Sequence, residues 1–207
     1  MAALRTLGIS ASPRRDGNTD LLLQRALRGA EEAGSQVEYL RLCDYRLEGC
    51  TECEACQSTG SCGIDDDYDR ILDKMLAADR IIFATPVFFM AVPAQAKALI
   101  DRGQCLWMRQ TVLRKPLFEP RRDRRGMIIA VGGSRGRLQF DCVQRPIQSC
   151  FDYLEVSHVG SLFINQVDEK GAVLKHPRAL EEVFRLGCEL VADTQPAPEK
   201  PVRIDLP

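Results

Sequence analysis

The sequence predicts a single α/β domain with a parallel sheet covered by helices on both faces. Three observations lead to this class: segments typical of strands and helices alternate along the chain, the third strand-like segment is apolar without interruption, and 207 residues are enough for one substantial domain but cramped for two. A continuous apolar run suits a strand that is buried on both faces of its sheet. We therefore expect five parallel strands joined by helices.

The expected strands are short, apolar segments bounded by turn residues, at 4–10, 37–42, 80–85, 126–131 and 156–164. The expected helices carry apolar residues at helical spacing, at 19–33, 68–78, 93–102, 142–154 and 178–191. Pro146 predicts that the fourth helix is kinked or begins late. This alternation favours the flavodoxin-like strand order 2-1-3-4-5, which places a cofactor crevice beyond the carboxyl ends of strands one and three.

The domain is expected to span 1–193, with a cysteine-rich loop at 50–62. The remaining residues, 194–207, include Pro196, Pro198 and Pro201 and should form an extended tail.

Composition and charge exclude several classes of partner. Hydrophobic residues make up 45%, charged residues 28%, and the net charge is −1, so we expect neither a nucleic acid nor an anionic membrane as partner. No apolar run approaches the roughly 20 residues that span a bilayer, and the first residues lack the pattern of a secretory signal. We therefore expect a cytoplasmic protein. One local basic cluster is expected to lie in a solvated loop before a strand: Arg121, Arg122, Arg124 and Arg125.

The loop after the first strand is rich in side chains that can bind an anion. It runs into a helix, whose N-terminus presents unpaired N–H groups and the positive end of a dipole. The loop has neither the P-loop spacing nor the glycine pattern of dinucleotide-binding folds, so a monophosphate fits best. An ordinary capped helix start would explain only Asn18 or Thr19. The candidate phosphate ligands are Ser10, Ser12, Arg14, Asn18 and Thr19.

The loops after the third and fourth strands complete the predicted crevice. Residues 87–92 are apolar where a solvated loop is expected, which indicates either a bound planar ring, a second subunit, or a loop packed into the core. Gly132 and Gly133 follow the fourth strand, and glycines let the backbone approach a flat ligand closely. Taken alone, this glycine segment would be an ordinary turn.

Four of the nine cysteines form a compact motif, C-x2-C-x2-C-x5-C. A reducing compartment disfavours disulfides, and clustered thiols in such a protein indicate metal or redox chemistry. Four thiolates at this tight spacing suit an iron–sulfur cluster of the [4Fe–4S] type, whereas structural zinc more often uses two separated pairs. Zinc and metal-free thiols remain the alternatives. The candidate metal ligands are Cys50, Cys53, Cys56 and Cys62. No catalytic acid or base is predicted.

Three motifs together resemble those of the NADPH-dependent FMN reductases: S-x-S-P-R-x-x-G-N-T, T-P-V-F-F-x-x-V-P-A-Q-x-K-x-x-I-D-R and G-G-S-R-G. The cysteine loop is most similar to that of the iron–sulfur flavoproteins within this group. The resemblance implies FMN, with its phosphate on the loop at 10–19. It also implies that the isoalloxazine lies against Pro86, Val87, Phe88, Phe89 and Met90, near Gly132 and Gly133. Met90 stands where the family more usually has a glycine, which bears on substrate size.

The resemblance implies a redox or electron-transfer flavoprotein with FMN and one cluster per subunit. Its partners would be a ferredoxin-like donor or NAD(P)H and a small acceptor such as a quinone or an oxygen species. A homodimer or homotetramer is implied, in which the cluster of one subunit approaches the FMN of a neighbour. Two other functions remain open: a cluster-free NAD(P)H-dependent FMN or quinone reductase, and a flavodoxin-like carrier that turns over no small substrate.

Overall fold

The computed structural model describes residues 3–207. Its sheet contains six strands in the order β2-β1-β3-β4-β5-β6, and every strand pairing is parallel. The predicted flavodoxin-like order 2-1-3-4-5 is therefore confirmed for the first five strands. The strands are β1 (Arg5–Ser10), β2 (Gln36–Arg41), β3 (Arg80–Pro86), β4 (Arg125–Val131), β5 (Ser157–Ile164) and β6 (Val202–Leu206).

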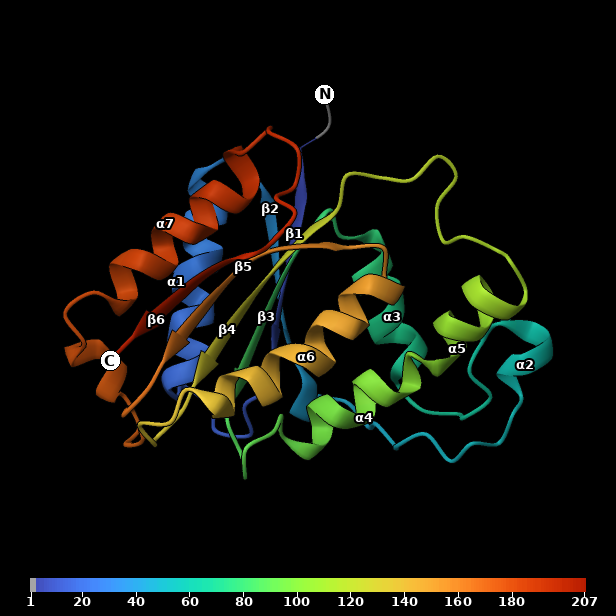
Figure 1. Ribbon diagram of the computed structural model, residues 1–207, viewed down its shortest axis with the longest axis horizontal. Helices are drawn as coiled ribbons and strands as arrows, with labels where there is room; N and C mark the ends of the chain where they lie inside the picture. The colour runs from blue at the N-terminus through green and yellow to red at the C-terminus, as the bar shows by residue number, and fades with distance from the viewer. Residues whose placement is uncertain (1–2) are drawn as a thin grey trace.

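The sixth strand comes from the segment expected to be only an extended tail. Val202–Leu206 pairs with Gly160–Ile164 of β5, and it forms the edge of the sheet (Figure 1). Prolines cannot donate ladder hydrogen bonds, so the proline-rich composition argued against a strand. The pairing begins only after Pro201, the last of these prolines. The prediction of five strands was thus one short.

Helices cover both faces of the sheet. One face is packed by α1 (Asn18–Glu32) and α7 (Ala179–Ala192), and the other by α3 (Tyr68–Ala77), α4 (Ala94–Arg102) and α6 (Leu138–Tyr153) (Figure 1). Four of these helices, α1, α3, α4 and α7, lie within one residue of their predicted bounds. Shorter helical segments that were not predicted are α2 (Cys56–Thr59), α5 (Gln104–Trp107), the π-helix η2 (Met108–Val112) and the 3-10 turns η1 (Leu42–Asp44) and η3 (Ala172–Lys175).

Helix α6 departs from the prediction at its start. It begins at Leu138, four residues before the expected 142, and continues through Pro146. The apolar residues Phe140 and Ile147 lie on either side of the proline and are both fully buried. Tertiary packing of this face holds the helix across the one backbone hydrogen bond that proline removes.

Helix α1 is fixed against α7 by a close crossing of their backbones. A Cβ added at Gly29 would lie 2.2 Å from the carbonyl oxygen of Phe184, and one added at Gly187 would lie 2.1 Å from that of Ala26. Only glycine fits at either position. This contact sets the position of α1, and with it the loop that leads into its N-terminus.

The basic cluster is exposed at Arg121 and Arg122, as expected of a solvated loop, but buried at Arg124 and Arg125. Arg124 is 1% exposed and donates hydrogen bonds to the backbone oxygens of Ala78, Leu154 and Met75. Arg125 is also buried. Carbonyl groups at the ends of elements satisfy the guanidinium of Arg124, which makes its burial possible.

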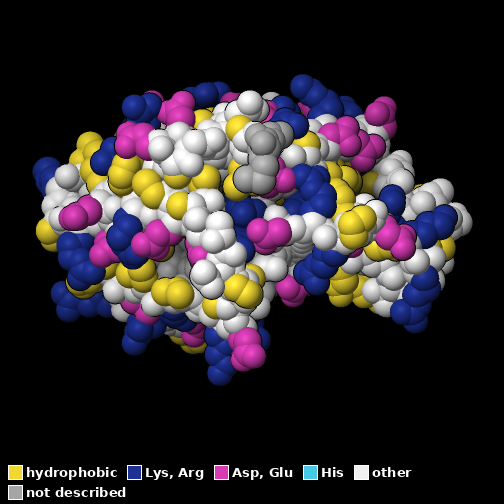
Figure 2. Space-filling view, turned by 90° about the horizontal axis from the view of Figure 1, so that it is seen from above, with side chains coloured by type: hydrophobic (Ala, Val, Ile, Leu, Met, Phe, Trp, Pro, Cys, Tyr) yellow, Lys and Arg dark blue, Asp and Glu magenta, His cyan; other side chains and the backbone are white. Residues whose placement is uncertain are grey.

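The surface at the amino ends of the strands carries basic and acidic side chains interspersed with one another (Figure 2). Within residues 3–207, no helix combines the length and the apolar composition needed to cross a membrane.

Candidate functional site

The loops at the carboxyl ends of the central strands are joined by backbone hydrogen bonds. Ala11 donates to the carbonyl of Ala84 at 2.8 Å, and Val87 donates to that of Val131 at 2.8 Å. The loops after β1, β3 and β4 therefore lie side by side at one edge, near the bottom of Figure 1. The side chain of Gln95, in the first turn of α4, adds a bond to the carbonyl of Ala11 at 2.6 Å.

The loop after β1 has the features of an anion site. Helix α1 begins after Gly17 without any side-chain cap, which leaves N–H groups of its first turn available to a ligand. Ser12 and Thr19 are buried beside this helix start. The Ser12 hydroxyl accepts a hydrogen bond from the backbone N–H of Arg14 at 3.2 Å, so it also stabilises the conformation of the loop. Ser10, another predicted ligand, donates to the buried carboxylate of Asp20.

Two predicted phosphate ligands contact a fourth loop, which sequence reasoning missed. The Asn18 side chain donates to the carbonyl of Glu169 at 2.8 Å and accepts the N–H of Val173 at 3.2 Å. The exposed Arg14 guanidinium donates to the carbonyl of Asp168 at 3.2 Å. The segment after β5 therefore closes over the first loop. The sequence offered one signal for this contact. The segment follows a fifth parallel strand, and the carboxyl ends of all parallel strands lie at the same edge of the sheet.

The glycine loop after β4 is shaped by a neighbouring glutamine. A Cβ at Gly132 would lie 2.4 Å from Oε1 of Gln139, which is buried and donates to the carbonyls of Ser134 and Gly136 at 2.9 and 2.7 Å. A side chain at 132 would therefore push the Gln139 amide away from these bonds, so glycine suits this position without reference to a ligand. Gly133, in contrast, is exposed at this edge.

The loop after β3 forms a tight two-residue turn with an apolar tip. Phe88 and Ala91 exchange two backbone hydrogen bonds of 2.9 Å, and Phe89 and Met90 between them both have left-handed backbone angles, with φ of 45° and 63°. Such turns favour Asn-Gly, and bulky residues in this conformation are strained. Phe89 is completely exposed, while Phe88 and Met90 are 48% and 44% exposed. Pro86 and Val87, at the base of the turn, are half-buried.

All four cysteines of the motif line one cavity of about 720 Å³. The cysteine segment lies at the far end of the molecule from β6, next to α5 (Figure 1). Glu52 and Glu54, on either side of Cys53, both have left-handed backbone angles, which makes this loop strained as well. Among residues 3–207, no three His, Cys, Asp or Glu side chains are gathered around the position of a single metal ion.

A fifth thiol and a buried arginine complete the wall of the cysteine cavity. The thiol of Cys105 is buried and lies 3.4 Å from the Tyr68 hydroxyl. Burial raises the pKa of Cys105 and also that of Cys56, so both sites favour a neutral thiol in the absence of a cation. Arg102, at the end of α4, donates from Nε to Sγ of Cys62 at 2.9 Å.

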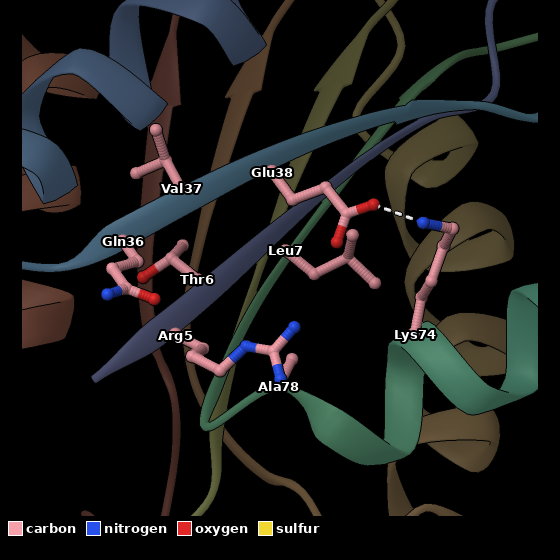
Figure 3. A pocket seen from close by; sticks show the side chains of 8 residues that line it. All are labelled: Arg5, Thr6, Leu7, Gln36, Val37, Glu38, Lys74 and Ala78. Carbon is pink, nitrogen blue, oxygen red and sulfur yellow. Dashed lines mark hydrogen bonds and ion pairs between the residues drawn. The ribbon is translucent and has the colours of Figure 1, made fainter. Parts of the chain in front are cut away.

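A smaller cavity of about 280 Å³ lies at the opposite edge of the sheet, at the start of β1 and β2. Figure 3 shows Lys74 reaching across it to pair with Glu38. None of the predicted site residues lines this cavity. Its lining residues are Arg5, Thr6, Leu7, Gln36, Val37, Glu38, Lys74 and Ala78.

Comparison with known proteins agrees with the crevice geometry. Residues 4–167 match the family model of NADPH-dependent FMN reductases. The matched residues include the crevice loops after β1, β3 and β4 and the cysteine segment. This chain belongs to that family. Membership makes the protein an FMN-dependent oxidoreductase and confirms the resemblance seen in the sequence motifs.

Similar proteins include iron–sulfur flavoproteins of archaea. One from Methanocaldococcus jannaschii is 39% identical over 142 residues, covering 69% of each chain, and one from Methanosarcina thermophila is 34% identical over 191 residues, covering 92% of this chain and 91% of that one. Among solved structures, an NAD(P)H:quinone oxidoreductase from Methanothermobacter marburgensis superposes with a TM-score of 0.69 at 19% identity, over 94% of this chain and all of that one. This last similarity concerns the fold alone.

Proposed function

We propose that the protein is an FMN-dependent electron-transfer enzyme that also binds a [4Fe–4S] cluster on Cys50, Cys53, Cys56 and Cys62. The observation that carries the proposal is the single cavity of about 720 Å³ that these four side chains line. A zinc ion needs four sulfurs at about 2.3 Å from one point, whereas a cubane fills a larger space between its thiolates. The gathering of four thiols around one cavity supports the cluster, and so do the iron–sulfur flavoproteins to which the chain is similar.

The crevice residues would bind FMN at two places. Ser12, Thr19 and the free N–H groups at the start of α1 would hold the phosphate, with Arg14 adding charge. The turn at 86–90 and the backbone at 132–133 would lie against the isoalloxazine. Flavin exchanges one or two electrons, while an iron–sulfur cluster exchanges one, so together the two groups would couple a one-electron donor to a two-electron acceptor.

The donor we propose is a ferredoxin-like protein, and the acceptor a small molecule such as a quinone or an oxygen species. We further propose a homodimer or homotetramer, because the apolar tip at Phe88, Phe89 and Met90 is too exposed for one flavin to cover. Sedimentation of the flavin-loaded protein tests the assembly. A strict monomer with full flavin and full activity contradicts it.

A cluster-free NAD(P)H-dependent FMN or quinone reductase is the second candidate, favoured by the description of the family model. One experiment separates the two. The protein is purified without oxygen, its absorption spectrum is recorded, and iron and sulfide are counted per chain. The proposal predicts about four of each, with broad absorbance that bleaches on reduction, in addition to the flavin bands. A pure flavin spectrum without iron would establish the plain reductase instead.

A further inference from the structure

Arg102 is an unusual residue for the end of a helix, because it is only 1% exposed. Its guanidinium donates from Nε to Sγ of Cys62 at 2.9 Å. Its two terminal nitrogens form a bidentate pair with Asp66 at 2.8 and 3.1 Å, and they also donate to the carbonyls of Glu48 at 3.1 Å and Ile64 at 3.4 Å. Every nitrogen of the group is therefore occupied, and one of them points at a predicted cluster ligand.

The partners of Arg102 hold it rigidly in this orientation. The Asp66 side chain is completely buried and accepts the backbone N–H groups of Glu48 and Tyr68 at 2.8 and 2.9 Å. The Tyr68 ring lies under the guanidinium, 4.6 Å from its central carbon. Asp66 and the two carbonyls thus fix the terminal nitrogens of Arg102, and Nε remains directed at Cys62.

We propose that Arg102 is a positioning residue that raises the reduction potential of the cluster held by Cys62. This inference rests on the proposed function. A reduced cluster carries one more negative charge than an oxidised one, so a hydrogen bond and a positive charge at a ligand sulfur stabilise the reduced form. Burial keeps water from screening the interaction. The Asp66 carboxylate offsets part of the positive charge and thereby limits the effect.

The test is a redox titration of the anaerobic holoprotein, with the reduced cluster followed by its EPR signal. Arg102→Lys keeps the charge but cannot reproduce the fork that aims Nε at the sulfur. We expect full iron content and a tenfold lower ratio of reduced to oxidised cluster at the original midpoint, which is about 59 mV toward negative potential for one electron. Arg124→Lys is the matched control: Arg124 is equally buried but bonds only to carbonyls, so the potential should not move.

One further measurement keeps the test decisive if Arg102→Lys does not fold. In unmutated protein labelled with ¹⁵N-arginine, pulsed EPR of the reduced cluster should detect coupling to a guanidinium nitrogen. Iron present with neither a shift in potential nor a ¹⁵N coupling would overturn the role of Arg102 alone. Absence of iron from the unmutated protein would overturn this role together with the proposed cluster.

Discussion

The crevice and the cysteine cavity are built by different means. In the crevice, loops from four adjacent strands are joined to one another by several backbone and side-chain bonds, such as those of Ala11 and Asn18. In the cysteine cavity, a long segment with a single short helix is closed by side-chain bonds at its ends, among them the buried pair of Arg102 with Asp66. The crevice thus follows from the order of the strands, whereas the cavity depends on a few side chains. The two should respond to mutation independently.

The largest expected effect is the loss of metal on removal of one thiol. Cys53→Ala should abolish stoichiometric iron and sulfide, because three thiolates remain where four are required. FMN should remain bound, since the loop at 10–19 is a separate element. Counting iron, sulfide and flavin per chain measures both outcomes. Cys142→Ala, which removes an exposed thiol on α6 outside the motif, should change none of them. Simultaneous loss of FMN would show that the two regions are not independent.

The second effect concerns the phosphate end of the crevice. Replacing Ser12 and Thr19 together with alanine removes two donors to an anion, each contributing about 1.5–3 kcal/mol, so FMN affinity should fall by roughly 100-fold or more. Riboflavin, which lacks the phosphate, should lose little affinity. Titration of iron-loaded apoflavoprotein with both ligands tests this. Ser35→Ala is the control, because Ser35 is a buried hydroxyl at the opposite edge, bonded to Thr6. Equal losses for FMN and riboflavin would place the phosphate elsewhere.

A smaller effect is expected when the pH is lowered, because the Asp66 carboxylate then becomes protonated and the loop loses stability. Burial raises the pKa of Asp66, but hydrogen bonds from Arg102 and from two backbone N–H groups outweigh it and hold the pKa below its usual value. The stabilisation is therefore complete above the unfolded pKa of about 3.9 and is lost as the pH falls through the lower folded value.

Urea unfolding of the iron-free protein measures this dependence. The difference in the free energy of unfolding between the unmutated protein and Asp66→Asn should shrink as the pH falls from 6 toward 3. Asp65→Asn, which changes the exposed neighbouring carboxylate, should give curves that stay parallel to those of the unmutated protein. A gap for Asp66→Asn that is independent of pH would contradict the assignment.

The smallest effect concerns strain at the crevice tip. Met90→Gly should relieve a left-handed backbone that costs a side chain about 1–2 kcal/mol, part of which is offset by the greater freedom of glycine in the unfolded chain. We expect a net gain in stability of up to about 1 kcal/mol by thermal unfolding. The same substitution at the adjacent Ala91, outside the left-handed positions, should instead destabilise. Equal behaviour at both positions would mean that the turn is not strained.

The difference between the crevice and the cysteine cavity also explains which features could be predicted from the sequence. Strand order and crevice position could be predicted, because apolar strands and helical spacing are local patterns and parallel topology then brings the loops together. The four cysteines were visible from spacing alone. Arg102 was not, since a helix-terminal arginine normally reaches solvent, and its contact with Cys62 joins residues 40 positions apart.

Other departures also arose from contacts distant in sequence. Asn18 was predicted to face a phosphate, yet both ends of its amide are engaged by the segment after β5. Arg124 was expected in water, but it is bonded to carbonyls from two other segments, the ends of α3 and α6. Strand β6 follows a run of prolines and pairs only because β5 offers a free edge. Local propensity cannot report such partners.

Helix α4 connects the two regions directly, since Gln95 in its first turn bonds the loop after β1 and Arg102 at its end bonds Cys62. Its nine residues fix both a spacing and an angle between these ends. One inserted residue would turn Arg102 by about 100° and move it by about 1.5 Å, and a whole extra turn would restore the angle but lengthen the spacing by about 5.4 Å. The helix can therefore accept changes of side chain along its length during evolution, but not changes in the number of its residues.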